Sequence, residues 1–110
     1  MYLTYFEVEM KLNPTQLSEN AKSVAETLKL LSNPFRLMIL CCLSEGELTV
    51  GELNEQVDLS QSALSQHLTK LRESKLVETR RESQTIYYRI EDSKVKGLLS
   101  YLQQNLCDDV

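Results

Sequence analysis

Apolar residues recur at the spacing of amphipathic helices in two long segments of this chain. The first segment follows Asn13-Pro14, and proline at the first helical position after an asparagine is a typical helix start. The second follows Asp92-Ser93, with apolar side chains three or four positions apart. We therefore expect a first and a last helix that each bury one apolar stripe. The stripes comprise Leu17, Ala21, Val24, Ala25, Leu28 and Leu31 in the first helix, and Val95, Leu98, Leu99, Leu102 and Leu106 in the last.

A helix of a different kind is predicted directly after the first one. Asn33-Pro34 ends the first helix and begins the next, and residues 34–43 are apolar on nearly all sides. Such a helix is typical of the buried centre of a domain. It closes before Glu47, and we expect Gly46 to supply a left-handed C-cap.

Residues 49–72 predict two short helices joined by a tight turn. Thr49 and Glu52 have the spacing of a capping box, which satisfies free amides at a helix start. Ser60 is a favourable N-cap for the second helix. Both helices carry an inward stripe, Val50, Leu53 and Val57 in the first and Leu64, Leu68 and Leu71 in the second.

The second of these helices carries a polar face opposite its leucines. At about 100° per residue, Ser62, Ser65, Gln66 and Thr69 fall on that face. Amides and hydroxyls can read base edges in a DNA major groove, and two short helices with a short turn favour a helix-turn-helix. A solvated helix face has the same pattern, so this stretch alone leaves both interpretations open. His67, the only histidine, flanks the leucines, and we expect it to be packed.

After Leu76 the pattern changes from helical to alternating. Val77 and Thr79 indicate one strand, and Ile86, Tyr88 and Ile90 indicate a second, with a turn near Glu82-Ser83 that lacks the Asn-Gly signal of a tight hairpin. The predicted fold class is therefore mainly α with a small β-hairpin (α+β). Five helices are expected, with the hairpin between the fourth and the fifth.

Length and composition limit the protein to a few classes. With 110 residues and 42% apolar content, one domain is expected, small enough that a second subunit would help it bury a core. We expect a tail or arm over 1–12, a domain over 13–107 and a tail over 108–110. No apolar run is long enough for a membrane span, and the first residues do not resemble a secretory signal. A cytoplasmic protein without membrane partners is expected, and its three cysteines are then thiols.

The charge is unevenly distributed. The net charge is −4, but residues 61–90 carry six positive and three negative side chains and the remainder carries −7. A basic face on an acidic body favours docking on DNA in one orientation.

The segment SQSALSQHLTKLRESKLVETRRESQTIYYRI, residues 60–90, resembles the second helix and wing of the arsenic-repressor (ArsR) family of bacterial winged-helix regulators. It is similar above all to the thiol- and persulfide-sensing branch that contains HlyU, BigR and SqrR. The similarity covers about Leu28 to Cys107, and LSQSALSQHL is its most specific part. The family implies a winged helix-turn-helix that forms a homodimer through its first and last helices.

The resemblance also implies a partner and a set of contacts. The partner is double-stranded DNA with a pseudo-palindromic operator, because a two-fold dimer presents two reading helices about one DNA turn apart. The implied contacts are Gln61 at the helix start, Ser62, Ser65 and Gln66 with bases, Lys70, Arg80 and Arg81 with phosphates, and Gln84 at the wing tip.

The family's metal ligands are absent from the matching positions. Thr49 and Gly51 stand where a metal-sensing relative has a Cys-x-Cys pair, and the last helix has no histidine. We therefore expect neither a metal nor a cofactor. Cys41 and Cys107 match the cysteine pair of the persulfide-sensing branch, which implies control by reactive sulfur or another oxidant. Cys42 is interpreted as a small core residue.

The predicted function is a DNA-binding transcription regulator, a repressor or an anti-silencing activator, controlled by oxidation or persulfidation of that pair. One alternative is a regulator without thiol sensing. A second is a thiol-dependent redox enzyme, although the chain has no Cys-x-x-Cys motif and no recognisable catalytic motif, so we expect no enzyme. A third is a winged-helix interaction module that does not touch DNA.

Overall fold

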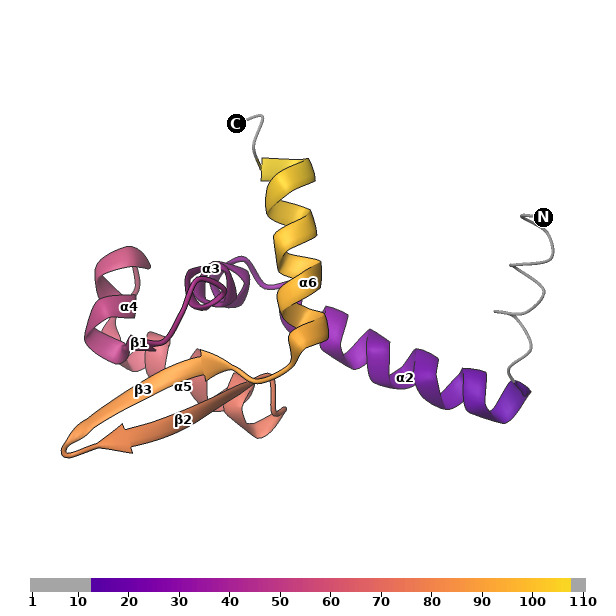
Figure 1. The fold of residues 1–110 in the computed structure, drawn as a ribbon, viewed down its shortest axis with the longest axis horizontal. Coiled ribbons are helices and arrows are strands. Elements are labelled where there is room, and N and C mark those ends of the chain that lie inside the picture. Colours follow the sequence, from indigo (N-terminus) through magenta and orange to yellow (C-terminus); the bar gives the residue numbers. More distant parts are fainter. Residues whose placement is uncertain (1–12, 108–110) are drawn as a thin grey trace.

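The computed structural model describes residues 13–107, without the side chains of residues 106 and 107. It contains five α-helices, a small antiparallel sheet and a closing π-helical turn, so the predicted fold class is confirmed (Figure 1). The expected tails over 1–12 and 108–110 lie outside the described residues. In chain order the elements are α2 (Pro14–Leu31), α3 (Pro34–Leu43), β1 (Leu48–Thr49), α4 (Val50–Gln56), α5 (Gln61–Glu73), β2 (Val77–Glu82), β3 (Thr85–Ile90), α6 (Ser93–Leu102) and η1 (Gln103–Cys107).

Side-chain caps fix the starts of the helices, as predicted. The backbone N–H of Thr49 donates to Glu52 Oε1 at 2.8 Å, and the Glu52 N–H donates to Thr49 Oγ1 at 3.1 Å, which completes the capping box of α4. Ser60 Oγ accepts from the Ala63 N–H at 3.1 Å and caps α5. The asparagine before each proline caps α2 and α3 in the same way. These caps satisfy amides that have no partner inside their own helix.

The core lies where α3, α4, α5 and the base of the hairpin meet. Both predicted stripes of the helix-turn-helix point into it, except that Val50 is only half-buried. Because each fully buried leucine or valine contributes roughly 1.5–3 kcal/mol, these side chains dominate the stability of the domain. The residues with an exposed fraction of 1% or less are Ile39, Leu40, Leu43, Leu53, Val57, Leu64, Leu68, Leu71 and Leu99.

The expectation that residues 34–43 form a helix buried on all sides was wrong for one face. Phe35 and Met38 are 40% and 43% exposed, whereas Ile39, Leu40 and Leu43 are buried. The physical reason is that the core covers only the inner side of α3. The outer side of its first turns has no such cover within the described part of the chain.

The end of α3 also differs from the expectation. Ser44, with an ordinary helical φ of −65°, is the C-cap, and its N–H donates to Leu40 O at 2.9 Å. Gly46 lies two residues further on with φ +150°, a conformation that side-chain-bearing residues rarely adopt. The glycine therefore turns the chain toward β1 and does not cap the helix.

The sheet has one strand more than predicted. Its order is β1-β3-β2, and β1 pairs with β3 through Leu48–Tyr88 and Thr49–Tyr87. In the hairpin, Val77 faces Ile90 at the base and Glu82 faces Thr85 near the tip. Ser83, with φ 60°, begins the turn, within one residue of the predicted position. The two-residue strand β1 ties the hairpin to the start of α4.

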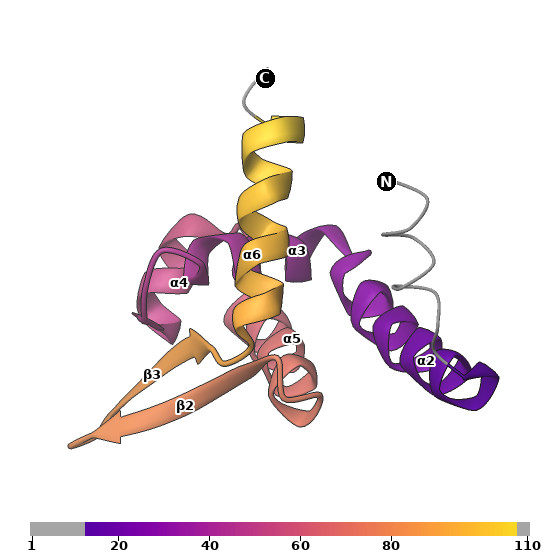
Figure 2. The ribbon, with the colours of Figure 1, turned by 45° about the vertical axis from the view of Figure 1, so that its right-hand side comes forward.

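Helix α2 projects away from the rest of the molecule (Figures 1 and 2). Its C-terminal end is attached to α3, where Leu31 is buried and Arg36 Nε donates to Leu30 O at 2.9 Å. Within the described part of the chain the rest of its predicted apolar stripe is exposed: Leu17, Val24 and Leu28 are 50%, 56% and 50% exposed.

Helix α6 rises from the end of β3, beside α3 (Figure 1). Val95 and Leu99 are buried in the core, while Leu98 and Leu102 are half-buried. The α-helix ends at Leu102 and continues as the π-helical turn η1. None of the helices within residues 13–107 is long and apolar enough to cross a membrane.

Candidate nucleic-acid interface

The outward face of α5 carries the three polar side chains that were predicted to contact bases. Ser62, Ser65 and Gln66 are exposed, and Gln61 is exposed at the first turn. The leucines of the same helix are almost completely buried, so the orientation of α5 is fixed by the core. A rigid helix with hydroxyls and an amide on one exposed face is suited to hydrogen bonding with base edges.

Positive charge gathers at the C-terminal end of α5. Lys70 and Arg72 are exposed in its last turn. Lys70 also lines a groove of about 550 Å³ between α2, α3 and α5, together with Lys29 and Arg36. That Lys29 and Arg36 lie close to Lys70 could not be predicted from the sequence, because they belong to other helices and no local pattern relates them to α5.

The wing, residues 77–90, presents its two arginines on opposite faces. Successive side chains of a strand alternate, so Arg80 and Arg81 point to different sides of the hairpin. Arg81 shares a face with the buried Val77, but it lies beyond the core and is exposed. Gln84 is exposed at the tip. Arg81 and Gln84 are therefore accessible to a molecule that approaches the wing.

Arg80 is engaged within the protein. Its Nε donates to Glu47 Oε1 and Oε2 at 2.9 and 2.8 Å, and its Nη1 donates to Glu82 Oε2 at 2.9 Å. The guanidinium also lies 4.3 Å from the ring centroid of Tyr87. The hydrogen bonds from Arg80 hold the pKa of Glu47 below its ordinary value. A phosphate contact by Arg80 stays a prediction, and any phosphate would compete with two carboxylates.

A second ion pair crosses the hairpin nearer its base. Arg89 donates to Glu78, its partner in the strand register. The pKa of Glu78 is lowered, first by its hydrogen bond with Glu91 and then by its hydrogen bonds with Arg89. The same hydrogen bond with Glu78 raises the pKa of Glu91. These contacts fix the two strands to each other where they leave the core.

His67 is half-buried between α5 and α3, as expected for a packed histidine. Its ring stacks on Phe35 with centroids 6.1 Å apart and an interplanar angle of 29°. Burial, followed by the charges of Arg36 and Lys70, lowers the pKa of His67 below 6.5. Among residues 13–107, no group of three or more His, Cys, Asp and Glu side chains is arranged to hold a metal ion.

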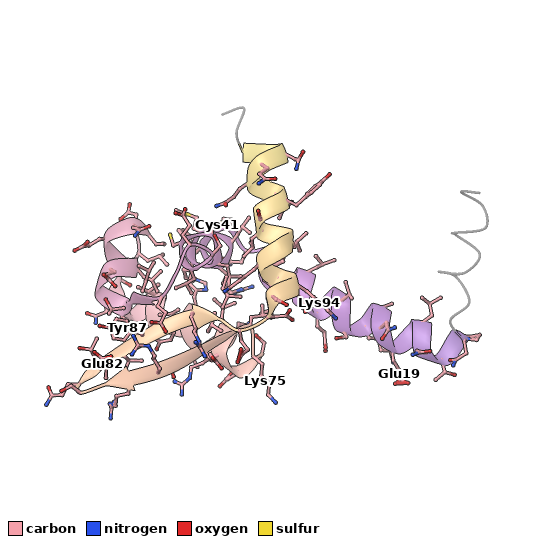
Figure 3. All side chains as sticks on the ribbon, in the orientation of Figure 1. Glu19, Cys41, Lys75, Glu82, Tyr87 and Lys94 are labelled. Carbon is pink, nitrogen blue, oxygen red and sulfur yellow. The ribbon has the colours of Figure 1, made fainter. Side chains whose placement is uncertain are left out.

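The cysteines of α3 differ in their surroundings. Cys41, labelled in Figure 3, and Cys42 are both half-buried. Burial, and then the carboxylate of Glu45, raises the pKa of Cys42, which disfavours its reactive thiolate. Cys107 ends η1, but its side chain lies outside the described residues. The pairing of Cys41 with Cys107 stays a prediction.

Helices α4 and α5 followed by the hairpin define a winged helix-turn-helix protein. Residues 33–79 match the family described as "Bacterial regulatory protein, arsR family". The chain is 43% identical over 96 residues to the transcriptional activator HlyU of Vibrio cholerae, covering 87% of this chain and 89% of that protein. It is 46% identical over 91 residues to the biofilm growth-associated repressor of Xylella fastidiosa, covering 83% and 80%. The chain therefore belongs to the arsR family and is a transcriptional regulator.

Solved structures agree with this assignment. Reduced HlyU from Vibrio cholerae superposes with a TM-score of 0.80 at 43% identity, covering 84% of this chain and 98% of that chain. The homodimeric winged helix-turn-helix DNA-binding domain of a Mycobacterium bovis protein superposes with a TM-score of 0.72 at 32% identity, covering 86% and 87%. The resemblance inferred from residues 60–90 is thus confirmed.

Proposed function

We propose that this protein binds a specific DNA operator as a homodimer and that a pair of cysteines controls the binding. The observation that supports operator reading is the exposed face of α5, where Ser62, Ser65 and Gln66 stand together on a helix held rigidly by buried leucines. Gln61 would lie near a phosphate or a base. Lys70 and Arg81 would contact phosphates, with Gln84 at the wing tip. Base contacts then set sequence choice, and phosphate contacts set affinity and salt dependence.

The uncovered stripe of α2 supports the homodimer. Isolated helices with exposed leucines and valines are unfavourable in water, and a second copy can cover them together with α6. A similar domain from Mycobacterium bovis is homodimeric. Two-fold symmetry would place the two α5 helices about 34–36 Å apart, one turn of DNA, and so select a pseudo-palindromic operator.

Selection of bound duplexes from a random pool tests operator binding. We expect an enriched pseudo-palindromic sequence, and binding that weakens steeply with salt because phosphate contacts release counterions. The selected duplex and a scrambled duplex of the same composition are then compared at one salt concentration. Equal affinity for both, or no binding to any duplex, would contradict the proposal and favour an interaction module.

The proposed switch uses Cys41 in α3 and Cys107 at the end of η1, which match the cysteine pair of the persulfide-sensing branch. A disulfide between them would release two protons and two electrons to an oxidant. A longer bridge would take its extra sulfur from a persulfide donor, which leaves as a thiol, and closing that bridge would likewise pass two protons and two electrons to an oxidant such as a second persulfide. Either bridge would fix η1 against α3 and shift the dimer surface. The existence of a solved relative named as reduced HlyU is compatible with a regulator that responds to oxidation.

Mass spectrometry after treatment with a persulfide donor tests the switch. We expect a mass increase on the peptides that contain Cys41 and Cys107, accompanied by a changed affinity for the selected operator. Cys41→Ser should abolish any bridge between the two peptides and the change in affinity. Cys42→Ser is the matched control, because its thiol is adjacent and poorly ionised, and it should respond like the wild type. If the protein stays unmodified and its operator affinity is unchanged, the thiol switch is contradicted and a regulator without thiol sensing is favoured.

Repression and activation are both represented among the relatives, one of which is named an activator and one a repressor. We propose a repressor, or an activator that displaces other DNA-binding proteins, acting in the cytoplasm. A thiol enzyme is the remaining alternative, and turnover of a peroxide or a disulfide by the purified protein would favour it.

A further inference from the structure

The contacts of Arg80 join the wing to the segment that leads into the helix-turn-helix. Arg80 faces Tyr87 directly across the hairpin, and Glu82 follows two residues later on the same side. Glu47, in contrast, lies 33 residues earlier, in the turn between α3 and β1. The hydrogen bonds between Arg80 and Glu47 therefore join the hairpin to the turn before β1, two segments that are far apart in the sequence.

The charge around Arg80 makes it a poor phosphate contact. One guanidinium is surrounded by two carboxylates, so the group Glu47, Arg80 and Glu82 has a net charge of −1. A DNA phosphate that approached Arg80 would meet both carboxylates and would have to displace one of them. Arg81, on the opposite face, is exposed and takes part in none of the ion pairs found among the described residues.

We propose that Arg80 is a positioning residue and that Arg81 is the arginine through which the wing contacts DNA. The bonds between Glu47 and Arg80, here called the wing latch, set the direction of the hairpin relative to α4 and α5. Phosphate binding by Arg81 and Gln84 depends on that direction. This inference rests on the proposed DNA-binding function and assigns different roles to two adjacent arginines of the same site.

The two possible roles of Arg80 predict opposite effects of Glu47→Gln. If Arg80 contacts phosphate, loss of a competing negative charge frees the guanidinium, and operator binding tightens. If the latch positions the wing, the same substitution loosens the hairpin, and binding weakens by up to about fivefold, the upper end of what an exposed ion pair contributes. Fluorescence anisotropy with the selected operator measures the sign directly.

Glu45→Gln is the matched control. Glu45 is exposed in the same turn and forms none of the ion pairs identified within residues 13–107. Its substitution removes the same charge and leaves the latch intact. We expect unchanged or slightly tighter operator binding, in contrast to the weaker binding of Glu47→Gln. Tighter binding by both variants would overturn the proposal.

Lysine substitutions of the two arginines separate their roles further. Lysine keeps a point charge for a phosphate but cannot form the two-sided contacts that a guanidinium makes. Arg80→Lys should therefore weaken operator binding as much as Glu47→Gln, and the two changes together should weaken it no further. Arg81→Lys should retain most of the affinity, whereas Arg81→Gln should lower the slope of affinity against salt by about 0.9, the loss of one phosphate contact. Full affinity in Arg80→Lys would contradict a positioning role.

Hydrogen exchange in the absence of DNA tests the latch independently of DNA binding. The amides of β2 and β3 should exchange faster in Glu47→Gln than in the wild type or in Glu45→Gln. If the wild type binds no duplex, the proposed function fails while the exchange result still shows whether the latch holds the wing. If the wild type binds DNA and Glu47→Gln exchanges normally, only the latch is excluded.

Discussion

Gln66 and Leu68 are two positions apart on α5, yet one side chain is exposed and the other is almost completely buried. The difference follows from the helical rotation of about 200° between them. For this reason the spacing of leucines in the sequence was sufficient to identify which side chains of α5 face outward. The individual contacts of these side chains with bases stay predictions.

Gln66→Ala should weaken binding to the selected operator by about 1–3 kcal/mol and change binding to random DNA little, because an amide that bonds a base carries sequence information. Fluorescence anisotropy on both duplexes measures the difference. Gln104→Ala, an exposed glutamine on η1, serves as the control and should change neither affinity. An equal loss on both duplexes would remove Gln66 from base reading.

His67 should titrate below the ordinary histidine pKa of about 6.5 in the folded protein. Because the folded state then binds fewer protons than the unfolded state, stability should decrease as the pH is lowered from above 6.5 toward the folded-state pKa. Since His67 is the only histidine, a single NMR resonance reports its titration. His67→Gln should lose this pH dependence, and a pKa at or above 6.5 would contradict the packing argument.

The partner of Arg80 could not be predicted from local sequence. Glu82 and Tyr87 are near Arg80 in the hairpin. Glu47, in contrast, lies in a turn that precedes the helix-turn-helix in the sequence. The pairing of β1 with β3 brings that turn to the wing. Sequence patterns identify exposed faces well, and they say little about which exposed charges meet.

Capping residues and leucine stripes account for most of the predicted elements. They fixed both ends of the helix-turn-helix to within a residue or two. Strand β1 was missed because two residues cannot display an alternating pattern, and Thr49 already had a role as the cap of α4. The exposed side of α3 was not predicted, because a helix that is apolar on all sides gives no indication of which sides the rest of the fold covers.

Ser60→Ala should lower the free energy of unfolding by about 1 kcal/mol, since it leaves the N–H of Ala63 without its cap at the start of α5. Urea denaturation measures the change. Ser62→Ala, two residues later on the exposed face, should leave stability within about 0.5 kcal/mol and weaken operator binding instead. A stable Ser60→Ala protein would indicate that another group caps α5.

At the scale of the whole molecule, a single chain has a larger radius of gyration than a compact domain of the same length. Its radius of gyration is 16.8 Å, whereas a compact domain of this length has about 13 Å. The difference reflects α2, which reaches away from the core with its apolar stripe exposed (Figure 2). Sequence periodicity predicted the stripe correctly but gives no information on whether it is buried within one chain or between two.

Val24→Glu should convert the proposed dimer into a monomer, because it places a charge in the middle of the exposed stripe of α2. Analytical ultracentrifugation measures the mass, and operator affinity should fall strongly because one monomer contacts one half-site. Lys22→Glu introduces the same carboxylate on the opposite face of α2 and should remain dimeric. Monomeric wild-type protein at micromolar concentration would contradict the proposed assembly.

The exposed stripe of α2 also determines which equilibrium describes folding. In the proposed dimer, a subunit completes its burial of apolar area only when it meets a second one, so folding is a two-body reaction. Each tenfold dilution then reduces the stability of the pair by about 1.4 kcal/mol. The number of copies per cell consequently sets how much intact regulator exists, before any inducer acts.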